Sequence, residues 1–259
     1  MAISTEFDPG PPANVAQHLA NMPSYEPHRD LFWYDWGPVF YRGRLNGAAK
    51  VMGVASDPGP AEQVACRTLV GDAGQRVQGF LTKLGLVRNY VLVNAHPFAL
   101  HPGHFDEGMD LLDNVQLKNW RNTFYDLITD STLEAIVAFG AQAQKAVDLW
   151  TNKPSGVPVV KIPHPSNPGS ATALAAKYAA AITQLRGVVT PDSGGSTTGP
   201  DYGAQIVEAD YAPIPRRDLG FGVPPSLGDD KWARTAVPRQ SNGVKRSGDL
   251  SLTWRIPVA

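Results

Sequence analysis

The sequence contains very little cysteine: among its 259 residues there is one, Cys66. A single cysteine excludes an intrachain disulfide and any metal or iron–sulfur site that is built from several thiolates. A lone thiol is in keeping with a reducing compartment, so we expect a cytoplasmic protein.

Long hydrophobic runs and an excess of one charge are also missing. No apolar run approaches the ~20 residues that a transmembrane helix needs, and the first residues, MAISTEFDPGPP, lack the basic head and apolar stretch of a secretory signal. The formal net charge is -1, so no overall basic field indicates a nucleic-acid partner, and such a partner would have to be held by local patches. We expect no association with a membrane.

What the sequence does contain is a regular alternation of short apolar runs and helical patterns. The four runs, rich in Val and Ile, span residues 50–55, 90–95, 135–140 and 157–162. Apolar residues at helical spacing occupy residues 73–84, 110–127, 141–149 and 171–185. This order predicts an α/β fold with three layers, α/β/α, around a central four-stranded parallel sheet.

The two ends of the chain differ in composition from this middle part. We therefore expect residues 49–188 to form the α/β domain, with residues 1–48 as an N-terminal extension packed on its core. Aromatic residues of the extension are predicted to be packing residues: Phe32, Trp33, Tyr34, Trp36, Phe40 and Tyr41. Residues 189–259 read as a flexible linker, over residues 191–203, followed by a tail rich in Pro, Gly and basic residues. The composition leaves open whether this tail wraps the core, binds a polyanion or stays partly disordered.

Three polar side chains follow the predicted strands at the points where those strands end. Asp57 follows the first strand, Asn94 ends the second and His164 follows the fourth. Each has an ordinary explanation, since Asp57 fits a surface turn, Asn94 a turn cap and His164 a solvated loop. Together they arrive at the edge of the sheet where open α/β folds bind ligands. An Asp can orient a water, an Asn can read a donor–acceptor edge, and a His can donate to an oxygen that becomes negative.

Other chemistry is less well supported by the residues. The histidines His96, His101 and His104 lie close together in sequence, but they read as loop residues, and we expect no metal there. No phosphate-binding Gly-rich loop with a Lys and no nucleophile–base pair stands out. We therefore expect no cofactor.

These motifs resemble those of the uracil-DNA glycosylase superfamily, over roughly residues 48–187. Residues 55–62, ASDPGPAE, resemble the Gly-Glu-Ala-Pro-Gly-x-x-Glu motif of the iron–sulfur-type members, and residues 68–75, TLVGDAGQ, resemble the Pro-Phe-Val-Gly-x-Ala-Gly that follows it. The strand that ends in Asn94 resembles the uracil-reading strand, and His164-Pro165-Ser166 resembles the His-Pro-Ser motif. Asp57-Pro58 also resembles the Asp-Pro of the Gly-Gln-Asp-Pro-Tyr motif in the uracil-specific branch.

The resemblance implies a monofunctional glycosylase that hydrolyses the bond between uracil and deoxyribose in DNA, and it implies a role for each matching residue. Asp57 would orient the attacking water and His164 would stabilise the leaving uracil. The uracil-binding residues would be Asn94, Leu69, Ser56, Pro58 and Gly59. The DNA-binding residues would be Ser166, Asn167, Gly169, Ser170 and Gly71. The partner would be uracil-containing DNA, bound by a monomer without an iron–sulfur cluster.

The departures from the family pattern leave two alternatives open. The acid of the iron–sulfur-type motif is Ser56 here, the Tyr that helps to exclude thymine is Gly59, and the uracil-stacking Phe is Leu69, for which Phe98 is a candidate substitute. A protein that binds uracil-containing DNA with little turnover is one alternative. An unrelated α/β protein that acts on a small ligand is the other.

Overall fold

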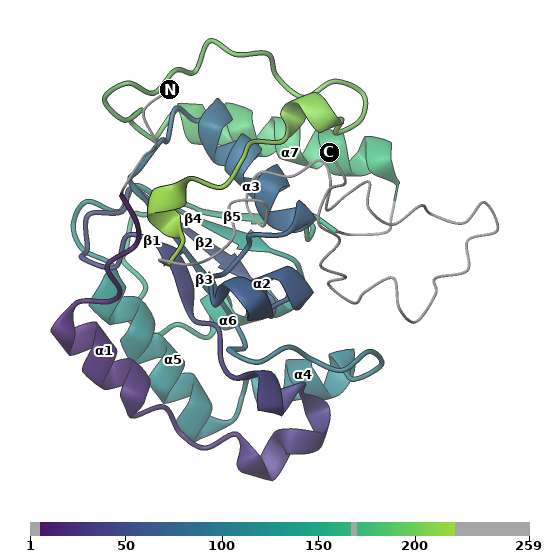
Figure 1. Ribbon diagram of the computed structural model, residues 1–259. Coiled ribbons are helices and arrows are strands. Elements are labelled where there is room, and N and C mark those ends of the chain that lie inside the picture. Colours follow the sequence, from purple (N-terminus) through teal and green to yellow (C-terminus); the bar gives the residue numbers. More distant parts are fainter. Residues whose placement is uncertain (1–5, 167–169, 221–259) are drawn as a thin grey trace, which may run out of the picture.

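The computed structural model describes residues 6–166 and 170–220, which form an α/β fold (Figure 1). Its sheet has five strands in the order β1-β3-β2-β4-β5. These strands are β1 (Tyr41–Gly43), β2 (Val51–Ala55), β3 (Tyr90–Asn94), β4 (Ala135–Phe139) and β5 (Val159–Ile162). Each of the four predicted apolar runs contains one of β2 to β5, and these four strands pair in parallel.

The prediction of a four-stranded, all-parallel sheet is wrong in one respect. The additional strand β1 pairs with β3 in the antiparallel direction, with Tyr41 opposite Val93, so the sheet is mixed. A strand of three residues is too short to show a periodic pattern in the sequence. Its position is set by pairing with β3, which the local sequence of β1 does not encode.

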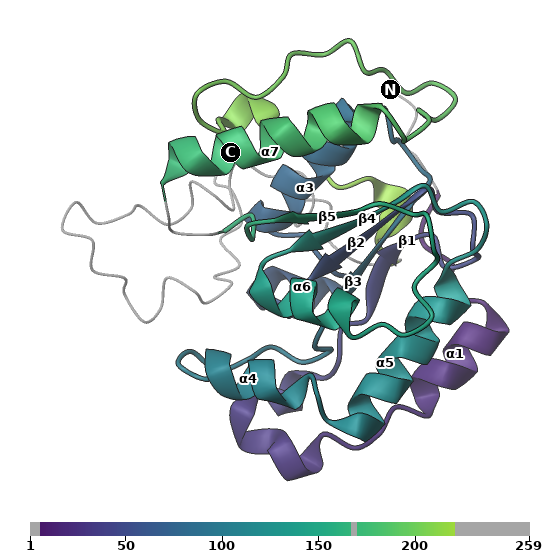
Figure 2. The same cartoon turned by 180° about the vertical axis from the view of Figure 1, so that it is seen from behind.

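Helices cover both faces of the sheet, which gives the three expected layers (Figures 1 and 2). One face packs against α3 (Asp72–Lys83) and α7 (Ala171–Arg186), and the other against α5 (Val115–Ile128) and α6 (Ala141–Asp148), with α1 (Ala13–Ala20) beside α5. The shorter helices are α2 (Pro60–Ala65), α4 (Phe105–Leu111) and the single-turn elements η1 (Glu26–Leu31), η2 (Tyr34–Trp36), η3 (Glu208–Asp210) and η4 (Arg216–Asp218). Alternate residues of β2 to β4 enter opposite cores, so these strands are buried on both faces.

The helix expected over residues 110–127 is two helices in the structure. The first, α4, ends at Leu111, and α5 begins at Val115. The side chain of Asn114 accepts hydrogen bonds from the backbone N–H groups of Gln116 and Leu117, at 3.1 and 3.2 Å. This N-cap starts a new helix because it satisfies two of the N–H groups that have no partner in the first turn.

The N-terminal extension packs on the core as expected, but its aromatic residues do not all pack. Phe32 and Tyr41 are buried, whereas Trp33 is 47% and Trp36 is 60% exposed. The prediction is therefore wrong for Trp36, which lies in η2. Trp33, the residue before η2, packs on one side against the ring of His101, with the ring centroids 4.3 Å apart.

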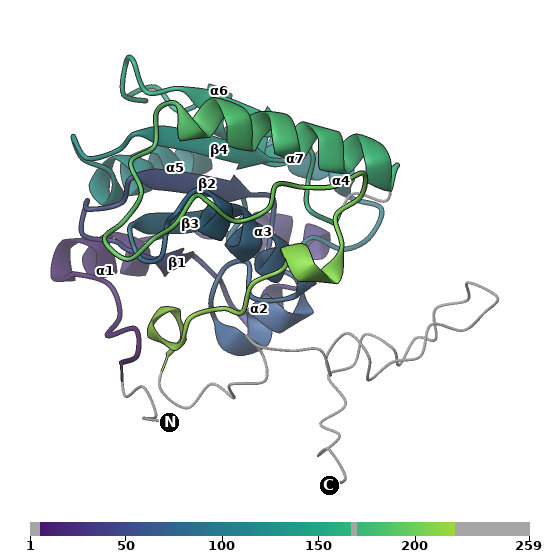
Figure 3. The same ribbon diagram turned by 90° about the horizontal axis from the view of Figure 1, so that it is seen from above.

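The segment that was expected to be a flexible linker packs against the core. Both carboxylate oxygens of Asp192 accept hydrogen bonds, three of them from the backbone N–H groups of residues 87–89 at 2.7–3.0 Å. Tyr202 is buried against Tyr178 of α7, in an edge-on ring contact. Figure 3 shows residues 187–220 running over α3 toward the β1 edge. The composition left three possibilities open for the C-terminal tail. Its residues up to 220 wrap the core.

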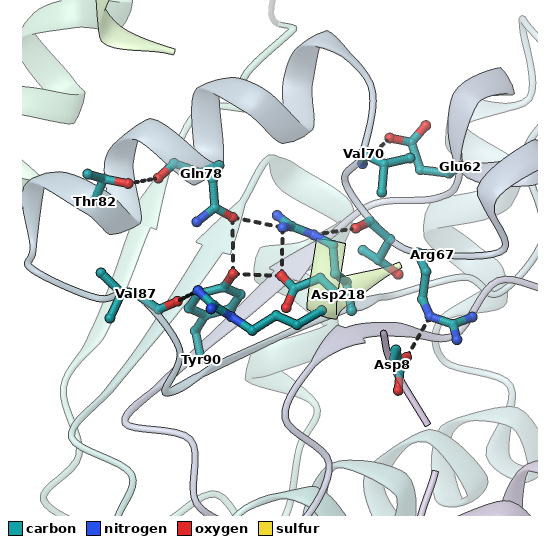
Figure 4. A network of polar contacts seen from close by, with 12 residues as sticks. Asp8, Glu62, Arg67, Val70, Gln78, Thr82, Val87, Tyr90 and Asp218 are labelled. Carbon is teal, nitrogen blue, oxygen red and sulfur yellow. Dashed lines mark hydrogen bonds and ion pairs between the residues drawn. The ribbon is translucent and has the colours of Figure 1, made fainter. Parts of the chain in front are cut away.

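This C-terminal segment is joined to the core by a buried ion pair. The Oδ2 atom of Asp218 lies 3.0 Å from Nη1 of Arg42 and accepts a hydrogen bond from the Tyr90 hydroxyl at 2.6 Å. Gln78 also contacts Arg42, at 2.7 Å. Figure 4 shows Gln78, Tyr90 and Asp218 converging on this network, although Asp218 lies 128 residues after Tyr90 in the sequence.

Candidate active site

The carboxyl ends of the parallel strands bring the predicted site residues together. In the register of β2 and β3, Ala55 lies opposite Asn94, and the pairing continues one step further, with His96 N–H donating to the Ser56 carbonyl at 2.9 Å. Gly140, which follows β4, lies close to the residues that follow β2 and β5. A Cβ on Gly140 would be 3.0 Å from the Cβ of His164 and 3.4 Å from Oγ of Ser56. The ends of β2, β3, β4 and β5 therefore form one rim that carries Asp57, Asn94 and His164.

Asp57 is held at this rim by the loop that follows β3. Its Oδ2 atom accepts a hydrogen bond from the backbone N–H of Leu100 at 3.0 Å. Burial raises the pKa of Asp57 to about 6, the Leu100 hydrogen bond opposes this rise, and the nearby carboxylate of Glu62 adds to it. Asp57 is thus not the solvated acid of an ordinary surface turn. A carboxyl with its pKa raised by burial, at the ligand-binding edge of a sheet, is a candidate for chemistry.

His164 is neutral and has a defined tautomer. The backbone N–H of Ser166 donates to its Nδ1 atom at 3.2 Å, so Nδ1 is the acceptor and, in the tautomer assigned from this contact, Nε2 carries the proton. Burial lowers the pKa of His164 to about 4, and the positive charge of Arg76 contributes to the same shift. At neutral pH the ring therefore offers one N–H donor, at Nε2.

Asn94 is fixed by the chain that precedes β1. It is 7% exposed, and its Nδ2 atom donates to the carbonyl of Val39 at 3.2 Å. This bond, and not the capping of the turn after β3, holds the side chain. Among the residues that the structure describes, no other hydrogen bond holds its Oδ1 atom or second N–H, and these groups suit a ligand edge that offers a donor beside an acceptor.

Glu62 joins the two loops that resemble the family motifs, and sequence reasoning gave it no role. Its carboxylate accepts hydrogen bonds from the backbone N–H groups of Gly59, at 3.0 Å, and of Val70 and Gly71, at 2.8 Å each. The position of Glu62, three residues after Gly59 at the start of α2, was the available signal, because an acid at this spacing reaches back to the start of its helix.

Leu69 lies between these loops in a left-handed backbone conformation, with φ of 55°. It is 5% exposed and belongs to the core on the α3 side of the sheet. Its carbonyl would be 1.8 Å from a Cβ on Gly74, so Gly74 is required for this close approach. Leu69 therefore presents little surface to a ligand.

The other residues predicted to bind uracil or DNA lie in different surroundings. Pro58 is buried, while Gly59 is half-buried at the start of α2. The prediction that the Gly71 amide contacts phosphate is wrong, because that N–H donates to Glu62. Ser166 is exposed, and Ser170 caps α7 by accepting from Ala173 N–H at 3.3 Å. Asn167 and Gly169 lie outside the described residues.

Phe98 does not lie free at the rim as a replacement for the missing stacking residue. It is 3% exposed and packs with Tyr25, Phe32 and Tyr34 of the N-terminal extension. These contacts assign it to the aromatic cluster under that extension.

Arg76 is a second residue that sequence reasoning missed. Its Nη1 atom donates to the carbonyl of Pro165, and its Nε atom donates to the hydroxyl of Tyr211 at 2.6 Å. It therefore ties the loop that carries His164 to the C-terminal segment. No local signal identifies it, because its partners lie far away in sequence.

The histidines after β3 do not form a metal centre. His96 is buried, with Nε2 bonded to the Gly108 carbonyl at 3.0 Å, and its pKa is lowered to about 3 by burial. Within residues 6–166 and 170–220, no three His, Cys, Asp or Glu side chains are arranged to hold a metal ion. In the same residues no helix is long and apolar enough to cross a membrane.

No protein-family model matches this chain, and no curated protein matches its sequence. The function must therefore be argued from the residues at the strand ends and from their geometry.

Proposed function

We propose that this chain is a monofunctional uracil-DNA glycosylase, an enzyme of base excision repair that hydrolyses the N-glycosidic bond of uracil in DNA. The observation that supports it best is the meeting of Asp57, Asn94 and a neutral His164 at one rim of the sheet. An acid, a carboxamide and a fixed N–H donor are the groups that this reaction needs.

The first requirement of the reaction is access to the base. A uracil inside a duplex must be flipped out, at a cost of a few kcal/mol, or be met in a single strand. The free Oδ1 and N–H of Asn94 would pair with the adjacent N–H and carbonyl of uracil. A site built for that edge rejects cytosine, because it leaves buried polar groups unpaired. The sequence resemblance also assigns Ser56, Pro58, Gly59 and Leu69 to this pocket. The deep burial of Leu69 favours weak stacking on the base.

The second requirement is to stabilise the charges that develop as the bond breaks. The uracil becomes an anion and the sugar becomes cationic. His164 would donate its Nε2 proton in a hydrogen bond to a uracil carbonyl oxygen, an interaction typically worth roughly 3–4 kcal/mol. Asp57, mostly ionised above about pH 6, would stabilise the sugar cation and orient a water toward it. Water supplies the oxygen, so the reaction balances without a cofactor.

DNA would be held beside this rim. We propose that Ser166 and the N-terminus of α7 at Ser170 would contact phosphates, since helix N-termini favour anions. Such contacts position the strand and do not read its sequence. We propose no strand cleavage, because no lysine is assigned to attack the sugar, and we propose that the enzyme acts as a monomer in the cytoplasm.

The test is incubation of the protein with end-labelled DNA that contains one uracil. Alkali-dependent cleavage at the uracil, lost in Asp57→Asn, would support the proposal. The matched control is Asp130→Asn, which changes an exposed acid in the turn before β4, at the other end of that strand from the rim, and is expected to keep full activity. Absence of cleavage in the wild-type protein would contradict the proposal.

A second function is favoured by the buried Leu69, since a residue that stacks weakly on the base supports catalysis poorly, whereas Asp57 argues against it. It is a protein that binds uracil-containing DNA with little turnover. A band in a gel-shift assay that depends on uracil, without cleavage, would support it. If neither signal is found, an α/β protein for an unrelated small ligand is the remaining reading.

A further inference from the structure

A cleft of about 220 Å³ lies at the opposite edge of the sheet from the candidate active site. It is lined by residues 6–10 and 12 of the N-terminal segment, by the turn after β1, and by Arg88, Arg217 and Asp218. The backbone N–H of Arg44, in that turn, donates to the carbonyl of Tyr90 at 2.8 Å, and Tyr90 is the first residue of β3. Asn94 is the last residue of the same strand, so the two sites lie at opposite ends of it.

Three arginines line this cleft, and the acids around them are already occupied. Glu6 pairs with Arg88 at 2.6 Å. Asp8 pairs with Arg67 at 2.7 Å, and Asp218 pairs with Arg42 at 3.0 Å. The negative charge of Asp192 raises the pKa of Arg44. The carboxylate of Asp192 accepts hydrogen bonds from the backbone N–H groups of residues 87–89 and lies 3.4 Å from Nζ of Lys50.

Arg44 and Arg217 are left without an ion-pair partner among the residues that the structure describes. Arg217 donates to a neutral group, the carbonyl of Val87, at 2.5 Å. The Nε atoms of Arg44 and Arg217 are both buried without a hydrogen-bond partner. Each cation therefore has donor capacity that the described part of the chain does not use.

The surroundings of Arg44 disfavour its charge on balance. Burial lowers its pKa, as do the charges of Arg88 and Arg217, while the carboxylates of Asp192 and Glu6 oppose this shift. Buried donors without acceptors add a desolvation penalty. A bound anion would remove both costs, because it neutralises the charges and accepts the free N–H groups.

We propose that this cleft is a binding site for a small phosphate-bearing anion, held by Arg44 and Arg217. Guanidinium groups offer paired N–H donors that match phosphate oxygens in two-point contacts. The volume is below the ~300–1,000 Å³ of sites for larger ligands, so the cleft suits a phosphate or diphosphate group with a small substituent. A free anion or a phosphate of the DNA backbone offers this same chemistry.

The test is isothermal titration of the full chain with inorganic phosphate and with pyrophosphate, at an ionic strength matched with chloride. We expect saturable binding of one equivalent, and a Kd at least about tenfold weaker in Arg44→Gln and in Arg217→Gln. The control is Arg29→Gln, which changes an exposed arginine of η1 that already pairs with Glu26 and Asp35.

Two results would overturn the proposal: no saturable binding to the wild type, or equal affinity in the wild type and both cleft variants. Affinity for uracil-free single-stranded DNA separates the two sources. If the source is DNA, Arg44→Gln weakens DNA binding and reduces its dependence on salt; if it is a free anion, DNA binding is unchanged. None of these measurements depends on uracil release, so they stand apart from the test of the proposed activity.

Discussion

The backbone N–H of Leu100 donates to the Oδ2 atom of Asp57 across 3.0 Å, which joins the loop after β3 to the turn after β2. This bond supports a carboxylate that its surroundings otherwise destabilise, since burial raises the Asp57 pKa to about 6. The protein thus keeps an acid at the strand-end rim at the expense of its own stability, as is common for groups with a chemical role.

Asp57→Asn is expected to make the protein more stable and less active. A raised pKa means that the folded state binds a proton more tightly than the unfolded state, so the wild type loses stability as the pH rises from about 4 to about 6. Each pKa unit is worth about 1.4 kcal/mol, so the variant should gain roughly 1–3 kcal/mol at neutral pH. Urea unfolding at several pH values checks this: the gain should vanish below about pH 4, and a variant less stable than the wild type at neutral pH would contradict it.

The pH dependence of uracil release should show one ionisation on the acid side. The rate should rise with the ionisation of Asp57, near pH 6, and then stay level. His164 stays neutral above about pH 4, so it adds no fall at alkaline pH. His164→Ala should lower the level rate by ~10²–10³ without moving the midpoint. Single-turnover rates across this range decide it, and an unchanged rate in the variant would remove His164 from the mechanism.

The parallel core of the fold could be predicted because its signals are local. Apolar runs such as residues 90–95 are too short for helices and too apolar for loops, and each contains a strand. The strand β1 could not be predicted, because three residues give no periodicity. The wrapping of residues 191–219 could not be predicted either, since it depends on single contacts such as that of Asp192 with residues 87–89, across about a hundred residues of chain.

The candidate site, like the fold, could be predicted only in part. That Asp57, Asn94 and His164 would meet could be predicted, because strand ends in a parallel sheet share one edge. The contacts that support these residues could not be predicted. The neutral state of His164 depends on burial and on the charge of Arg76. The position of Leu69 depends on the hydrogen bond that the next residue, Val70, donates to Glu62. The residues that hold a site act through tertiary contacts, for which a single sequence gives no pattern.

Asn94→Asp is expected to remove the preference for uracil. The new carboxylate would face the Val39 carbonyl, which now accepts from Nδ2 at 3.2 Å, and two acceptors would repel each other. Leaving that carbonyl unpaired should also cost about 1–3 kcal/mol of stability. Uracil and cytosine release are compared in single-turnover assays well below the melting temperature. Unchanged discrimination in a folded variant would mean that Asn94 does not read the base.

Glu62→Gln is expected to loosen both loops of the rim. The carboxylate accepts three backbone hydrogen bonds, whereas a carboxamide has one acceptor atom and would turn its N–H groups toward other donors. We expect a loss of about 1–3 kcal/mol in stability and faster amide exchange at Gly59, or at Val70 and Gly71, according to which carboxylate oxygen the new NH₂ group replaces. Glu107→Gln, at an exposed position of α4, is the matched control. Normal exchange at all three amides would show that the two loops keep their structure without Glu62.

Asp218→Ala is expected to be the most destabilising of these changes. Arg42 is fully buried, and its Nη1 atom lies 3.0 Å from Asp218 Oδ2, so removal of the acid leaves a buried charge without its partner. Such a change typically costs about 3–5 kcal/mol, whereas an exposed pair contributes about 0–1 kcal/mol. Asp201→Ala, which breaks the more exposed pair with Arg186, is the comparison. Urea unfolding should separate the two variants by several kcal/mol.

The double variant Arg42→Met/Asp218→Leu should recover much of the loss, because it removes both charges together. Equal stability of the two single variants would instead mean that packing of residues 202–219, and not the ion pair, holds the C-terminal segment on the core.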